Sequence, residues 1–323
     1  MTAVLMTLAP MSGAHAQTYP TKPIALVMPY TPGGGTDFLA RTVAQRLERR
    51  LGQPLVFEYR PGAGSAIAAT YMSRQAADGY TILYATSTTM AINVSVHKAL
   101  AYDPIKDFAP VALFAVTPFV LVVNASLPIR SIDDLVAFAK SKPGALSYAS
   151  NGPGGAAHLF AELTKTMLGI EMTHVPYKGN APALNDVAAG HVSLMFVDPL
   201  ASLQLVRGGK LRALGVTTAK RVSAAPELPP LTEAGLPGYD AASWHMFVVP
   251  AATPKPIVQR LYGEIDAIIK EPEVVAEILK RGFESSAGGP PEQLAQFVQS
   301  EIERWSKVVR AAAGVDVVWV GPA

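Results

Sequence analysis

The sequence contains no cysteine, so disulfides, thiolate metal sites and cysteine nucleophiles are excluded. Charge is also sparse: only 16% of the residues are charged, and the net charge is +2. A nucleic-acid-binding protein would have a clustered basic face, whereas the basic residues here are scattered, and the pair Arg49–Arg50 is expected at a solvated helix end. We therefore expect no nucleic-acid partner.

Long apolar runs are missing beyond the N-terminus, where no window reaches about 18 uninterrupted apolar residues. Residues 1–16 are expected to be a signal peptide, because a short apolar stretch precedes Ala14-His15-Ala16, which is typical of a cleavage site. No Lys or Arg precedes this stretch, so we expect the printed start to lie inside a longer signal peptide. The mature protein is expected to be exported and soluble.

Strand-like segments, glycine-rich turns and helix-like segments alternate along the chain, which favours parallel sheets covered by helices on both faces. At 323 residues and 50% hydrophobic composition, the chain can form two cores. Strands are expected at 23–30, 55–60, 80–86, 119–124, 146–150, 172–177, 192–198, 211–218 and 244–250, and only helices after them. Helices are expected at 37–51, from the 61–65 turn to about 76, 131–142, from the 150–156 turn to about 168, 181–189, 254–270, 272–281 and 290–312.

The last three helices need a sheet to cover, and the first block of strands lacks such partners. We therefore predict an α/β fold with two lobes and two crossovers, near 117–121 and 242–248. Lobe I would comprise 17–118 plus 247–323, and lobe II would comprise 119–246. This is the layout of a two-lobed periplasmic-binding-protein (Venus flytrap, type II-like) fold, with a ligand in the cleft between the lobes.

Three glycine-rich turns are each expected between a strand and a helix, at 32-PGGGTD-37, 61-PGAGS-65 and 150-SNGPGGAAH-158. Ligands collect at the carboxyl ends of strands in open α/β sheets. Unpaired N–H groups at helix starts favour a negative, oxygen-bearing ligand. No P-loop and no G-x-G-x-x-G motif is present, so a carboxylate fits better than a phosphate or a dinucleotide. We expect no cofactor and no metal.

Other polar residues admit a binding role and a plainer one. The hydroxyl groups of 86-TSTT-89 could face the ligand or only bond the local backbone. Lys178 could meet a second carboxylate or stay in solvent. Asp198 would repel an anion, so it would orient a neighbouring group or cap a helix.

Enzyme chemistry has weak support in this sequence. His158, His174 and His191 lack metal-type spacing, and no H-E-x-x-H is present. A hydrolase using Ser150, His158 and Asp198 is conceivable, but no G-x-S-x-G elbow accompanies it. We expect His158 to pack or to face a ligand rather than to act as a base.

Several motifs taken in order resemble the tripartite tricarboxylate transporter receptors, also called Bug receptors. They are YPTKPIALVMPYTPGGGTD, VFEYRPGAGSAIAA, ADGYTILYATST, LSYASNGPGGAAHLFAELTK, THVPYKGNAPALNDVAAGHVSLMF and LRALGVTTAKR. The resemblance runs from about Tyr19 to the C-terminal helices. It implies a periplasmic receptor that takes up a small carboxylate and delivers it to a permease of two integral membrane subunits.

By motif, the resemblance also implies the residues that would hold the carboxylate, through backbone groups and ordered water. In the first lobe these are Tyr30, Gly33, Gly34, Gly35, Thr36, Gly64, Ser65, Thr86, Ser87 and Thr88. In the second lobe they are Ser150, Gly154, Gly155, Ala156, Lys178, Gly179, Asn180, Ala181 and Asp198. Two positions depart from the family pattern: Tyr59 stands where Asn is usual, and Ser65 where Gly is usual.

The sequence therefore predicts a monomeric receptor that holds a carboxylate without reacting with it. A carboxylate sensor that docks on a membrane signalling protein would use the same fold. The exported hydrolase remains a third alternative. Motion at the two crossovers would close the cleft on the ligand.

Overall fold

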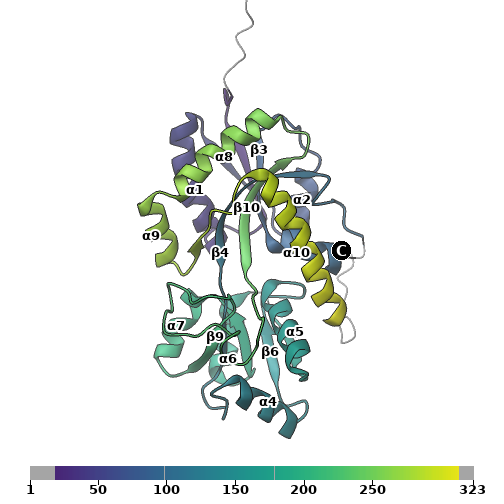
Figure 1. Ribbon diagram of the computed structural model, residues 1–323, viewed down its shortest axis with the longest axis vertical. Coiled ribbons are helices and arrows are strands. Elements are labelled where there is room, and N and C mark those ends of the chain that lie inside the picture. The colour runs from purple at the N-terminus through teal and green to yellow at the C-terminus, as the bar shows by residue number, and fades with distance from the viewer. Residues whose placement is uncertain (1–18, 98, 178, 313–323) are drawn as a thin grey trace, which may run out of the picture.

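The computed structural model describes residues 19–97, 99–177 and 179–312. It contains two mixed sheets, one above the other in Figure 1, each covered by helices. In the described part of the chain, no helix is long and apolar enough to span a bilayer.

The first sheet has the order β11-β4-β10-β3-β1-β2. Strands β1, β2 and β3 are parallel, whereas β10 runs antiparallel to both β3 and β4. Their bounds are β1 Ile24–Met28, β2 Leu55–Tyr59, β3 Thr81–Thr86, β4 Phe108–Thr117, β10 Ser243–Pro250 and β11 Glu284–Ser285. The predicted parallel arrangement therefore holds for the first three strands only.

The second sheet has the order β7-β6-β8-β5-β9. Strands β6, β7 and β8 are parallel, and β5 runs antiparallel to β8 and β9. Their bounds are β5 Val120–Asn124, β6 Ser147–Ser150, β7 Thr173–Pro176, β8 Leu194–Val197 and β9 Leu211–Val216. The chain passes between the sheets twice, from β4 to β5 and from β9 to β10.

Helices cover both sheets (Figure 1). Those of the first lobe are α1 Gly35–Leu51, the short turn η1 Ala63–Ser65, α2 Ala66–Met72, the π-helical turn η2 Thr88–Ile92, α3 Asn93–Val96, α8 Lys255–Ile269 and α9 Pro272–Lys280. Those of the second are α4 Ile132–Ser141, α5 Ala156–Leu168, α6 Asn180–Ala189 and α7 Pro199–Arg207. The last helix, α10 Pro291–Ala312, runs down beside both lobes.

Local sequence signals explain where several of these helices lie. In α1, apolar residues at four-residue spacing, from Leu39 to Leu51, are buried, and Gly52 ends the helix in the left-handed conformation. At the start of α4, the Ser131 side chain accepts a hydrogen bond from the Asp134 N–H at 3.1 Å, as the capping pattern predicts.

Five elements were not predicted: η2, α3, β4, α7 and β11. Strand β4 lies before the expected second block, α7 begins directly after Asp198, and the short β11 contradicts the prediction that only helices follow β10. β11 pairs with β4 through two residues at the edge of the first sheet. It is too short to show the alternating pattern on which strand predictions depend.

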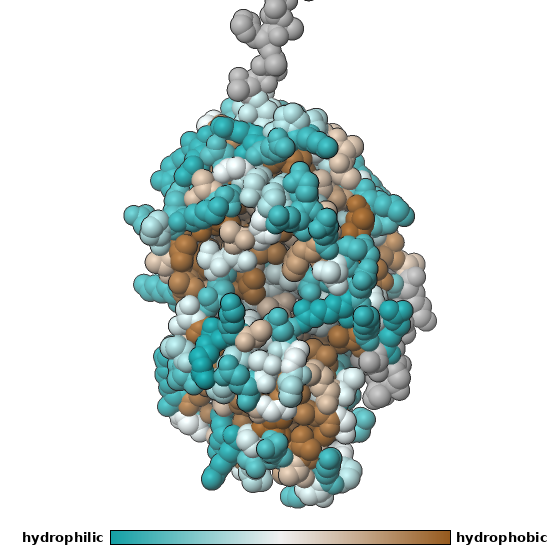
Figure 2. Space-filling model, viewed as in Figure 1, coloured by the Kyte–Doolittle hydropathy of each residue, from teal (hydrophilic) through white to brown (hydrophobic). Residues whose placement is uncertain are grey.

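The two lobes contact each other through side chains and backbone on more than one segment. The Ser223 N–H of the second lobe donates to the Glu284 carboxylate of β11 at 2.8 Å. Trp305 of α10 stacks on Phe160 of α5, with ring centroids 5.7 Å apart. These contacts hold the lobes close together in the described conformation. On the face in Figure 2, hydrophobic patches interrupt a mainly hydrophilic surface, including where the lobes meet.

Candidate functional site: a cavity between the lobes

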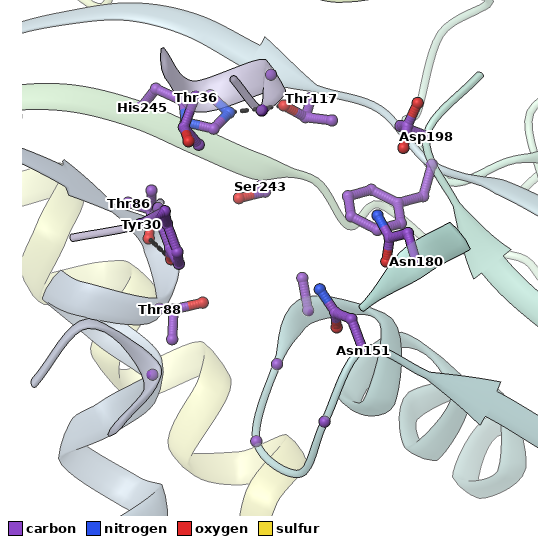
Figure 3. Close-up of a pocket in the computed structure, with 18 of the residues that line it drawn as sticks. Tyr30, Thr36, Thr86, Thr88, Thr117, Asn151, Asn180, Asp198, Ser243 and His245 are labelled. Carbon is purple, nitrogen blue, oxygen red and sulfur yellow. Dashed lines mark hydrogen bonds between the residues drawn. The ribbon is translucent and has the colours of Figure 1, made fainter. Parts of the chain in front are cut away.

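A cavity of about 700 Å³ lies between the two lobes. Its volume is in the range of small-molecule sites. In Figure 3, Tyr30, Thr86 and Thr88 approach it from the first lobe, and Asn151 and Asn180 from the second. Both lobes therefore contribute side chains to a single site.

The cavity brings together most of the residues that the sequence singled out. These are Tyr30, Gly33, Gly34, Gly35, Thr36, Gly64, Thr86, Thr88, Gly154, Gly155, Ala156, Asn180 and Asp198. The three glycine-rich turns thus converge on one space, although they lie far apart in the sequence.

Five of the candidate residues do not line the cavity: Ser65, Ser87, Ser150, Gly179 and Ala181. The side chain of Ser65 is buried and bonds the Thr89 hydroxyl at 2.8 Å, and that of Ser87 bonds the Ser243 hydroxyl at 3.2 Å. Their hydroxyl groups therefore have partners within the protein. Lys178 lies outside the described residues.

Three helices begin at or beside this cavity with a glycine at the N-cap. Gly34 precedes α1, Gly155 precedes α5 and Gly179 precedes α6, and none of these helices has a side-chain cap. The first N–H groups of a helix have no acceptor within the helix. Together with the positive end of the helix dipole, they favour an anion. The helix starts come from both lobes, so a single anion in the cavity could meet donors of each.

The first glycine turn is fixed by a carboxylate rather than left free. Asp37 accepts hydrogen bonds from the Gly33 N–H at 3.0 Å, from Arg41 at 3.1 Å and from the Tyr59 hydroxyl at 2.5 Å. Burial opposes ionisation of Asp37, but these hydrogen bonds and the Arg41 charge outweigh it and lower its pKa. Tyr59, the departure from the family pattern, therefore supports the turn through Asp37.

The hydroxyl groups after β3 form a connected set. The Tyr30 hydroxyl lies 3.1 Å from Thr86 Oγ1, which lies 3.3 Å from Thr89 Oγ1. Burial raises the pKa of Tyr30, so its hydroxyl stays protonated and can donate. This set presents neutral hydrogen-bonding groups, which suit an oxygen-bearing ligand.

The turn after β6 is held by two histidines. His158 Nδ1 accepts a hydrogen bond from the Gly154 N–H at 3.0 Å, and His174 Nε2 lies 2.7 Å from Ser150 Oγ. The two imidazoles stack with centroids 4.2 Å apart. Ser150 thus pairs with His174 and not with His158, so the conceivable hydrolase arrangement of Ser150, His158 and Asp198 is not present.

Asp198 caps α7, because its carboxylate accepts a hydrogen bond from the Ala201 N–H at 2.9 Å. Burial raises its pKa. The capping role that the sequence left open is therefore confirmed. Asn180 lies beside the cavity, and its Oδ1 is one of the few buried side-chain oxygens without a hydrogen-bond partner among the described residues.

Many residues that line the cavity were not predicted from the sequence. The missed lining residues are Phe38, Ala63, Asn93, Val96, His97, Thr117, Phe119, Asn151, Gly152, Pro153, Leu200, Ser243, His245, Arg281 and Phe283. Asn151, Gly152 and Pro153 belong to a turn that had been singled out and could have been included. Arg281 and Phe283 follow α9, where no glycine turn or strand end pointed to them.

The cavity has no obvious metal site. Among residues 19–97, 99–177 and 179–312, no group of three or more His, Asp or Glu side chains is arranged to hold a metal ion. The polar groups that the described walls offer are hydroxyl groups, amides, helix N-termini, one arginine, one aspartate and two histidines.

Comparisons with known proteins agree with this architecture. Among solved structures, an R. palustris protein with adipate is 41% identical, with a TM-score of 0.82 over 91% of this chain and 98% of that one. The periplasmic binding protein BugD is 32% identical, with a TM-score of 0.78 over 91% and 99%. MatC of Rhodopseudomonas palustris with bound malate is also 32% identical, with a TM-score of 0.78 over 90% and 100%. The fold is thus that of two-lobed periplasmic solute-binding proteins.

Sequence comparisons narrow the class to a family. The family model of tripartite tricarboxylate transporter receptors matches residues 39–313. BugT of Bordetella pertussis is 36% identical over 296 residues, which cover 91% of this chain and 90% of BugT. The chain belongs to the tripartite tricarboxylate transporter receptor family, a family of solute-binding receptors and not of enzymes.

Proposed function

We propose that this protein is a periplasmic receptor that captures a small organic carboxylate between its lobes and delivers it to a membrane permease of two integral subunits. The observation that carries the proposal is the meeting of uncapped helix N-termini from both lobes at one cavity. The relatives support the ligand class, because one was solved with adipate and another with malate. The permease partner is inferred from the family.

The second part of the proposal is that the protein binds its carboxylate ligand without catalysing a reaction of it. Ser150 Oγ, the candidate nucleophile of the hydrolase alternative, is buried and lies beside His174 and the Gly152 carbonyl. The glycine turns, hydroxyl groups and amides bind an oxyanion through neutral donors, and such donors stabilise a carboxylate without attacking it. We infer that lobe I comprises 17–118 plus 247–323 and lobe II 119–246, with the whole of β10, Ser243–Pro250, in the sheet of lobe I. We also infer that α10 packs against both lobes and that the receptor acts as a monomer.

The experiment is a thermal-shift screen of ligand-free protein against mono-, di- and aromatic carboxylates. A ligand present at 100 times its dissociation constant stabilises the folded state by about 2.7 kcal/mol, so at least one acid should raise Tm by several degrees. If no organic acid shifts Tm on protein shown to be ligand-free, the proposed function is wrong. Hydrolysis of a carboxylate ester by the purified protein would contradict the binding-only proposal.

A further inference from the structure

Arg281 contacts an aromatic ring at the cavity wall. It follows α9 and lines the cavity, and its guanidinium carbon lies 4.7 Å from the centre of the Phe38 ring. Phe38 in turn stacks on Phe283, with ring centroids 6.4 Å apart and planes inclined by 15°. A cation over an aromatic face is oriented without using its N–H donors, so the guanidinium can still bind an anion through them.

The segment that carries Arg281 lies where the lobes meet. Gly282 has φ 79°, and a methyl group there would lie 3.3 Å from the Leu200 backbone nitrogen in the other lobe. On the first-lobe side, a methyl group at Gly35 would lie 2.6 Å from the Phe283 ring. Arg281 therefore lies between the start of α1 and the start of α7, at the edge of the cavity.

Arg281, an exposed residue, supplies the positive charge of the cavity lining. Among the described lining residues, it is the only side chain with a permanent positive charge, and Asp198 is the only carboxylate. No ion pair to Arg281 is found within the described part of the chain, where Asp198 instead bonds the Ala201 N–H. An arginine placed in this way can bind a carboxylate with two parallel hydrogen bonds.

We propose that Arg281 is a specificity-determining residue that binds a second anionic group of the ligand, while the first carboxylate lies at the glycine turns. This inference rests on the proposed function. Phe38, Phe119 and Phe283 line the same cavity and suit an apolar spacer between the two charged ends. The receptor would thus select ligands with two anionic groups over ligands of the same length with one.

The experiment compares acids that differ only in the second carboxylate: adipate with hexanoate, suberate with octanoate, and terephthalate with benzoate. Dissociation constants are measured by calorimetry for the wild-type chain, Arg281→Met and Arg281→Lys. In the wild type, at least one diacid should bind more tightly than its matched monoacid. Arg281→Met should weaken that diacid by about 10- to 100-fold and leave the monoacid within about 2-fold, because only a charge-assisted contact is lost. Arg281→Lys should recover part of the loss.

Two control variants separate the proposal from simpler explanations. Arg260→Met removes an exposed charge from α8, away from the cavity lining, and should leave all dissociation constants unchanged. Asp198→Asn in the Arg281→Met background tests the alternative that Arg281 acts only by neutralising the negative charge of Asp198. Recovery of diacid affinity in this double variant would support that alternative and overturn the proposal.

Two further results would also overturn it. One is equal weakening of diacid and monoacid by Arg281→Met, since Arg281 would then contact the first carboxylate. The other is a wild type that binds no diacid more tightly than its monoacid. Binding of none of the acids would instead contradict the proposed function itself.

Discussion

The buried His158 and His245 and the half-buried His174 are kept neutral by the fold. Burial lowers the pKa of His158 and of His174 to about 4 and that of His245 to about 3, from an ordinary value of 6.5. His158 accepts a hydrogen bond at Nδ1, so its proton lies on Nε2. His245 lies between Tyr84 and Thr117, at hydrogen-bond distances of 2.9 and 2.6 Å. Protonation of these rings would disturb the turn after β6 and the first crossover.

These histidines predict how stability depends on pH. A lowered pKa means that the unfolded chain binds more protons than the folded one between about pH 6.5 and pH 4. Stability should therefore be complete above about pH 6.5 and should fall as the pH decreases toward 4. Thermal denaturation of ligand-free protein at pH 7.5, 6.5, 5.5 and 4.5 should show Tm decreasing by several degrees across this window.

A matched pair of variants identifies which histidine causes the dependence of Tm on pH. His158→Asn keeps an acceptor near the position of Nδ1 but cannot be protonated, so Tm should change less between pH 6.5 and 4.5 than in the wild type. His191→Asn removes an exposed histidine, 72% accessible, and should leave the slope unchanged. A Tm that does not vary between pH 6.5 and 4.5 in the wild type would contradict the buried, neutral state of these side chains.

At the scale of elements, the turn between β6 and α5 joins the two lobes at the cavity. Gly154 has φ 74°, and a methyl group there would lie 2.9 Å from Val96 Cγ1 in α3 of the other lobe. We predict that Gly154→Ala weakens carboxylate binding at least 10-fold, because the added methyl group separates the lobes where the ligand must contact both. Calorimetry with the acid that binds most tightly to the wild type measures the effect.

Gly169→Ala is the control for backbone strain. Gly169 ends α5 with φ 59°, and a methyl group there meets nothing within 4 Å. Both variants carry the cost of a left-handed alanine, about 1 kcal/mol, but only Gly154→Ala adds a contact between the lobes. Equal affinity in the two variants would show that close approach at Gly154 is not needed for binding.

The elements that could be predicted from the sequence are those with local signals. The apolar periodicity of α1, the cap of α4 and the glycine turns before α1 and α5 depend on neighbouring residues. By contrast, β4 is defined by pairing with β10, which lies more than 100 residues later, and β11 is defined only by two bridges to β4. Such long-range pairing leaves no periodic pattern in the short strand itself.

The residues of the candidate site also divide into those with a local sequence signal and those placed by long-range packing. The glycine turns allowed the sequence to predict that residues at the starts of α1 and α5 line the cavity, because strands end and helices begin there. Arg281, Phe283 and His245 reach the cavity only because the chain returns to the first lobe after β9. Their place depends on how the late segments pack, which neither composition nor spacing specifies.

At the scale of the whole molecule, two crossovers and α10 connect the lobes around the cavity. The segments β4–β5 and β9–β10 are the hinge candidates, since each passes from one sheet to the other. α10 packs on β4 and on α5, with Trp305 against Phe160. We expect α10 to stay packed on both lobes if the cleft opens, and a ligand that contacts both lobes to stabilise the closed arrangement.

The most direct test of the central claim is the dissociation constant of the tightest carboxylate for variants on opposite walls of the cavity. Thr88→Val removes a hydroxyl from the first lobe and Asn151→Ala an amide from the second, and both side chains face the cavity in Figure 3. Each lost hydrogen bond is worth about 1 kcal/mol, so calorimetry should show each variant binding about 5-fold more weakly. Unchanged dissociation constants in both variants would place the ligand outside this cavity and contradict the account.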